Sequence, residues 1–118
     1  MPAVHIYLSP AAETALAPRA GANRSAAASR MLERYEEACR RALPDLDEEE
    51  WQIIYGATNG WLIDSAASVR YLPMEVEDYL QDRDVHSSFP DLVAKLQALD
   101  YCGLMAVVDA AERYWASV

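Results

Sequence analysis

The start of the chain constrains the fold more than any other stretch. In VHIYLSP, residues 4–10, apolar residues alternate with residues that carry polar groups, and the apolar ones are Val4, Ile6 and Leu8. A period of two with these residue types predicts a β-strand over residues 3–9. No other segment of the 118 residues has a comparable strand pattern. A lone strand leaves backbone groups unpaired, so we expect it to pair with another polypeptide.

Helix start and stop signals divide the rest of the chain. Ser9, Asn23, Asp47 and Asp100 stand at N-cap positions, and Pro44 stops the second helix. The expected helices run from Pro10 to about Ala20, Arg24 to about Leu43, Glu48 to about Thr58, over 61–71 and 74–81, and onward from Pro90 and Asp100. Pro73 is expected to interrupt, and residues 82–88 to form a loop. The predicted fold class is therefore mainly α, with one strand at the start.

Charge divides the chain at Pro44. Residues 1–43 contain six arginines and four glutamates, a net charge of +2, whereas residues 44–118 contain four basic and fifteen acidic residues, a net charge of −11. We therefore expect two domains. Residues 1–43 would form a dimerisation domain, and residues 44–118 an acidic helical domain that binds a partner or an effector.

The simplest partner for the strand is the same strand of a second copy, antiparallel across a two-fold axis. A two-stranded ribbon is only marginally stable alone, so the helices that follow would have to cover its apolar face. Apolar residues of the strand and of helix 24–43 would then form the core of a homodimer. The predicted dimer-core residues are Val4, Ile6, Leu8, Met31, Leu32 and Tyr35.

The order strand, short helix, glycine turn, long helix over residues 3–43 resembles the ribbon-helix-helix DNA-binding proteins of the Arc/MetJ/CopG type. The stretches that carry the resemblance are VHIYLSP and AGANRSAAASR, which runs from Ala20 to Arg30. The resemblance covers about a third of the chain. It implies an intertwined dimer whose two-stranded ribbon enters the major groove of double-stranded DNA.

Carried over by position, the resemblance also implies which residues contact DNA. The outward-facing strand residues Ala3, His5 and Tyr7 would face base edges. Asn23, Arg24 and Ser25 would meet phosphate at the N-terminus of the second helix, where free N–H groups and the helix dipole favour an anion. This chain departs from the family at the outward strand positions, where the family usually has Arg, Lys, Thr or Gln.

Patterns for metal binding and catalysis are missing from the sequence. His5 and His86 are the only histidines, Cys39 and Cys102 are far apart, and no motif places a nucleophile beside a base. We therefore expect no metal site, no cofactor, no catalytic residue and no enzymatic activity. Reduced thiols and the lack of a signal segment or membrane span predict a soluble, cytoplasmic protein.

Two classes of function remain open. In the first, the chain is a dimeric DNA-binding transcriptional regulator, for example an antitoxin-type autorepressor whose acidic helices bind a basic protein such as a toxin. A variant of this class senses a small molecule. In the second, it is an acidic dimeric protein-interaction or inhibitor module without specific DNA binding. The acidic run at residues 45–50 fits a helix N-terminus, and it also fits a surface for a basic partner.

Overall fold

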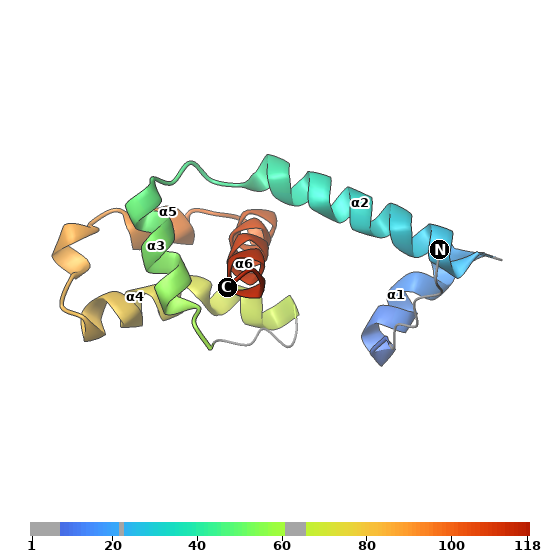
Figure 1. Ribbon diagram of the computed structural model, residues 1–118, viewed down its shortest axis with the longest axis horizontal. Helices are drawn as coiled ribbons and strands as arrows, with labels where there is room; N and C mark the ends of the chain where they lie inside the picture. The colour runs from blue at the N-terminus through green and yellow to red at the C-terminus, as the bar shows by residue number, and fades with distance from the viewer. Residues whose placement is uncertain (1–7, 22, 61–65) are drawn as a thin grey trace. The chain divides into compact units, whose positions relative to one another are not determined.

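The computed structural model describes residues 8–21, 23–60 and 66–118, which are mainly helical (Figure 1). The six α-helices of these residues are separated in two places by short 3-10 helices, labelled η. The elements are α1 (Pro10–Ala20), α2 (Arg24–Ala42), α3 (Glu48–Ala57), η1 (Ala66–Tyr71), α4 (Leu72–Asp82), η2 (His86–Ser88), α5 (Leu92–Gln97) and α6 (Tyr101–Ala116).

The predicted ribbon-helix-helix fold class is wrong, because the described part of the chain contains no β-strand. Residues 3–7 of the predicted strand lie outside the described residues. At its other end Leu8 is not in a strand, and Ser9 is the N-cap of α1, whose Oγ accepts the Ala12 N–H at 3.2 Å. A strand exists only as part of a hydrogen-bonded ladder. The partner strand was expected from a second copy, and every element of the described residues of this chain is a helix.

The predicted start of the helical region is confirmed in detail. The bounds of α1 are those expected, and Pro18 lies inside it without ending it before Ala20. Gly21 follows with a φ of 53°, a left-handed conformation that glycine adopts without strain. Asn23 then caps α2, because its Oδ1 accepts the Ala26 N–H at 3.0 Å. Local capping chemistry therefore sets this turn, as the sequence indicated.

The chain divides into two compact units, Met1–Glu37 and Ala38–Val118, so the division falls inside α2. We call them the N-terminal unit and the C-terminal unit, and each is considered by itself. The described residues of the N-terminal unit form a small core. Leu16, Ala20 and Ala27 are buried, and the half-buried Ala28 and Met31 pack against them.

The C-terminal unit has a much larger core, to which α3, η1, α4, α5 and α6 all contribute. Its fully buried members come mainly from aliphatic positions spaced three and four apart, as expected for one face of a helix. The buried residues are Ile54, Val69, Leu72, Val76, Leu80, Leu92, Leu96, Leu104, Val107 and Val108. Helix α4 contacts α3, η1, η2 and α5, so it lies at the centre of this unit.

Polar contacts fix both ends of α3. The predicted capping box is confirmed: Asp47 Oδ1 accepts the Glu50 N–H at 2.7 Å, and Glu50 Oε1 accepts the Asp47 N–H at 3.2 Å. At the other end, Trp115 Nε1 of α6 donates to the Tyr55 carbonyl at 3.0 Å and to Thr58 Oγ1 at 3.2 Å. These bonds connect α3 to a helix that lies far along the chain.

Two predictions for the middle of the chain need correction. Pro73 does not interrupt the helical structure. Helix α4 begins at Leu72, and Pro73 lies in its first turn, where the missing N–H costs no helical hydrogen bond. The predicted loop 82–88 contains the end of α4 and the short helix η2. Part of the helix expected over 61–71 lies outside the described residues, and the described part is the 3-10 helix η1.

Candidate functional site

The residues predicted to contact DNA fall in two groups. Ala3, His5 and Tyr7, expected to face bases, lie outside the described residues. The other three are Asn23, Arg24 and Ser25, and all three are exposed near the start of α2. The Asn23 side chain is already engaged as the cap of this helix.

Arg24 is also engaged within the chain. Its guanidinium donates to both carboxylate oxygens of Glu13, from α1. This side-chain hydrogen bond, together with the charge of Arg24, lowers the pKa of the Glu13 carboxyl, so the pair stays ionised at neutral pH. A DNA phosphate would therefore have to displace Glu13 from Arg24 before it could bind there.

The predicted dimer-core residues are dispersed in the single chain. Val4 and Ile6 lie outside the described residues, and Met31 is half-buried against the small core of the N-terminal unit. Leu8, Leu32 and Tyr35 are exposed, with 38%, 67% and 37% of their surface accessible. A role in a dimer stays a prediction for these residues. Their exposed apolar surface would be removed from water if a second chain covered it.

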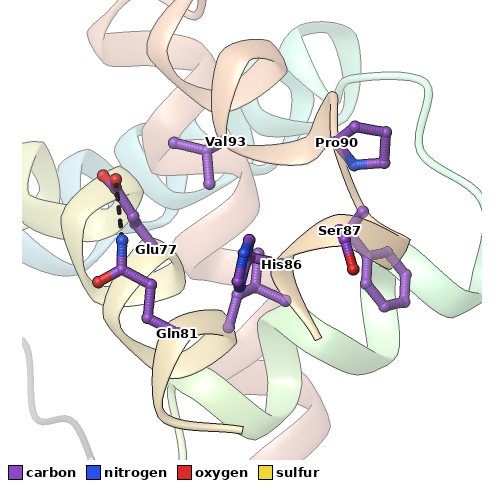
Figure 2. A pocket seen from close by; sticks show the side chains of 8 residues that line it. Glu77, Gln81, His86, Ser87, Pro90 and Val93 are labelled. Carbon is purple, nitrogen blue, oxygen red and sulfur yellow. Dashed lines mark hydrogen bonds between the residues drawn. The ribbon is translucent and has the colours of Figure 1, made fainter. Parts of the chain in front are cut away.

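A groove in the C-terminal unit forms a concave surface among the described residues. It lies between α4, η2 and α5, has a volume of about 370 Å³, and we call it the α4–α5 groove (Figure 2). This volume is within the range of about 300–1,000 Å³ that ligand pockets usually have. Its lining residues are Glu77, Leu80, Gln81, His86, Ser87, Phe89, Pro90 and Val93.

The α4–α5 groove combines an apolar floor with a polar rim. Leu80 is buried, and Phe89 and Val93 are half-buried, so an apolar ligand group would contact carbon on several sides. Glu77 and Gln81 lie along α4 on one side, with Gln81 Nε2 donating to Glu77 Oε1 at 3.5 Å (Figure 2). His86 and Ser87 of η2 lie on another side (Figure 2).

The loop that forms one wall of the α4–α5 groove is held by backbone hydrogen bonds. The Val85 N–H donates to the Leu80 carbonyl at 3.0 Å, and the Ser88 N–H donates to the Val85 carbonyl at 3.0 Å. Asp84 supplies the turn with a φ of 54°, a conformation that aspartate tolerates better than most residues. Val85 and Phe89 also pack against the core, so the wall exists before any ligand arrives.

A second, smaller hollow of about 180 Å³ shares Phe89 and Pro90 with the α4–α5 groove. Its other lining residues are Asp47, Glu49, Glu50, Ser88, Asp91 and Lys95. Lys95 Nζ lies 3.0 Å from both carboxylate oxygens of the buried Glu50, and this hydrogen bond raises the pKa of Lys95. The remaining carboxylates leave the hollow with an excess of negative charge.

Within residues 8–21, 23–60 and 66–118 no group of three or more metal-ligating side chains comes together. In the α4–α5 groove His86 is accompanied by a carboxylate and an amide, and by apolar side chains. No described helix combines the length and the apolar character that a bilayer crossing requires.

Analysis of the sequence missed this groove. Residues 82–88 were expected to form a loop, and Phe89-Pro90 was expected only to begin a helix. The available signal was a histidine, two serines and an exposed proline between two amphipathic helices, which is a weak pattern. Comparisons with protein-family models, with curated protein sequences and with solved structures found no match for the chain.

Proposed function

We propose that the chain is a protein-interaction module whose acidic C-terminal unit binds a basic partner protein. The observation that carries the proposal is the charge at the surface of residues 44–118. Eleven of the described acidic side chains in this range are exposed, while Glu50 is buried and Glu75 and Asp109 are half-buried. Such a surface attracts a positively charged protein and speeds its association.

The four basic side chains of the same range are too few to neutralise this surface, and each contacts a neighbouring side chain. Lys95 pairs with Glu50 at 3.0 Å, and Arg113 pairs with Asp109 at 3.0 Å. Arg83 lies over the Tyr79 ring at 4.5 Å, and Arg70 lies over the Tyr101 ring at 5.9 Å. The exposed carboxylates therefore outnumber nearby cations, which favours a partner that supplies positive charge.

Affinity capture with the full chain tests this proposal. The variant Glu48→Gln/Glu49→Gln keeps the Asp47–Glu50 capping box and removes two exposed charges beside the smaller hollow. We expect the full chain to capture a defined basic protein, the variant to capture less of it, and added salt to weaken the complex. Capture that is equal in both chains and insensitive to salt would contradict the proposal.

A second candidate is the DNA-binding regulator, and one observation favours it. The six arginines of residues 19–41 are all exposed on α1 and α2: Arg19, Arg24, Arg30, Arg34, Arg40 and Arg41. Exposed arginines on adjoining helices can contact phosphates without any ribbon. In this form the basic helices would hold DNA, and the acidic unit would bind the partner protein.

The Glu13–Arg24 pair provides a sharp test of the second candidate. If Arg24 contacts phosphate, Arg24→Ala should weaken DNA binding and reduce the slope of log K against log salt by about 0.9 per chain. Glu13→Gln should strengthen the same binding, because it releases Arg24 from its carboxylate. Fluorescence anisotropy with a labelled duplex measures both. Unchanged affinity in both variants would remove Arg24 from any DNA-binding surface.

A further inference from the structure

We propose that the α4–α5 groove is the specificity site of the C-terminal unit, and that it takes an apolar side chain from a basic, extended segment of the partner protein. This inference rests on the proposed function, which concerns only the charge of the unit. It adds the place of contact and the chemistry of the segment, namely an apolar anchor with lysine or arginine on both sides.

The first argument is the composition of the groove floor. Leu80 is buried, Phe89 and Val93 are half-buried, and Pro90 completes an apolar surface around an open volume of about 370 Å³. A volume of this size accommodates a leucine or phenylalanine side chain. An apolar side chain bound there would remove apolar surface from water, which favours binding.

The second argument is the charge that flanks this floor. Glu77 lies on the α4 side of the groove, while Asp47, Glu49 and Asp91 line the neighbouring hollow beyond Phe89 and Pro90. Lys95 is the basic residue among the lining side chains, and Glu50 already pairs with it. An apolar anchor bound beside Phe89 would therefore have carboxylates on both sides, which selects basic flanking residues and disfavours acidic ones.

The third argument is that the groove walls are preorganised. Backbone hydrogen bonds close the turn between α4 and η2, and Val85 and Phe89 are fixed by their packing against the core. The partner segment therefore does not have to order this loop when it binds, which removes one cost of association. The ordering that accompanies binding therefore takes place in the partner segment.

Three fluorescein-labelled ten-residue peptides test the proposal with the full chain. The first has a central leucine between lysines and arginines, the second has serine in place of the leucine, and the third keeps the leucine but has glutamine in place of every basic residue. We expect the first peptide to bind about tenfold or more tightly than the second, because the apolar anchor is lost. We expect the third to bind more weakly than the first and to lose the salt dependence.

Matched variants then locate the binding site. Ser87→Trp places a large side chain at the exposed rim of the groove and should weaken binding of the first peptide by about tenfold. Gln97→Trp makes the same change at an exposed position of α5 that does not line the groove, and should leave affinity unchanged. Glu77→Gln should weaken binding by about threefold, and Asp78→Asn, its exposed neighbour outside the groove lining, should have a smaller effect.

The outcomes separate this inference from the proposed function. If the leucine and serine peptides bind equally, and Ser87→Trp binds as the unchanged chain does, the acidic surface binds basic segments but the groove is not the specificity site. If no peptide binds while the capture experiment succeeds, the groove inference is likewise overturned. If Ser87→Trp instead abolishes self-association of the chain in sedimentation, a second copy occupies the groove and the inference is wrong.

Discussion

The two compact units differ sharply in how much apolar side chain they bury. Among its described residues, the N-terminal unit, residues 1–37, buries one leucine and two alanines in its core, with two further residues half-buried beside them. The core cluster of the C-terminal unit, counted over the described residues, contains ten buried aliphatic residues, and nine more apolar residues pack against it. The described residues of both units are mainly helical, so secondary structure alone does not make a unit stable by itself.

The difference indicates where each unit obtains its stability. Domains below about 40 residues usually need disulfides, metals or oligomerisation, because they bury too small a fraction of their surface. The N-terminal unit is in this range, and it exposes Leu32 and Tyr35 on α2. We therefore expect the C-terminal unit to be stable by itself, and the N-terminal unit to gain stability from another chain.

The largest expected effect contrasts the two cores. Leu72→Ala removes a fully buried side chain from the C-terminal unit and should lower the free energy of unfolding by about 2–5 kcal/mol. Leu16→Ala, in the N-terminal unit, should leave the main unfolding transition in place, because little of that transition comes from this small core. Urea unfolding followed by circular dichroism measures both. Equal destabilisation would show that the two units unfold as one.

The next effect concerns self-association through the N-terminal unit. If the exposed residues of α2 belong to the predicted homodimer, Leu32→Glu should weaken dimerisation by about tenfold or more, since a charge would enter an apolar contact. Met74→Glu makes the same kind of change at a 50% exposed position of the C-terminal unit and should not alter dimerisation. Analytical ultracentrifugation measures the dissociation constants. A monomeric chain at micromolar concentration would contradict the predicted homodimer.

The smallest expected effect is on the free energy of unfolding, and it contrasts Glu13 of the N-terminal unit with Glu112 of the C-terminal unit. Hydrogen bonding to Arg24 lowers the pKa of Glu13, so its stabilising contribution is present above its ordinary pKa and is lost as pH falls through the lowered value. Burial, together with repulsion from Asp109, raises the pKa of Glu112, so stability decreases as pH rises through the interval from the ordinary to the raised value.

Replacing each carboxylate with glutamine should therefore change the free energy of unfolding in opposite directions at pH 7. Glu112→Gln should stabilise the chain by at most about 0.5 kcal/mol, the scale of surface charge interactions. Glu13→Gln should destabilise the N-terminal unit slightly. Thermal unfolding at pH 7 and at pH 4 measures the change, and each substitution should have less effect at the lower pH. Stabilisation by both substitutions would contradict the difference in charge environment.

Local signals in the sequence predicted most of the helical architecture. The cap residues Ser9, Asn23, Asp47 and Asp100 all accept the expected backbone N–H, because capping depends only on residues three positions apart. The ribbon-helix-helix prediction was wrong because alternation describes one segment, whereas a ladder needs two. The sequence showed no second strand within the chain, and it could not show whether a second copy would supply one.

The candidate site was beyond prediction for a related reason. The α4–α5 groove depends on how Glu77 of α4, His86 of η2 and Val93 of α5 come together around Leu80, and no local pattern encodes that arrangement. The Glu13–Arg24 pair was equally hidden, since its members are 11 positions apart on two helices. The sequence did indicate the acidic character of the unit, because net charge depends on composition and not on the three-dimensional arrangement.

The hydrogen bond from Trp115 to the Tyr55 carbonyl has a consequence for synthesis. The two residues are separated by 60 positions, so at about 5–20 residues per second a ribosome needs roughly 3–12 seconds to make Trp115 after Tyr55. During that interval α3 has neither this bond nor the apolar side of α6 to pack against. The core around Ile54 therefore cannot be completed until α6 has been made.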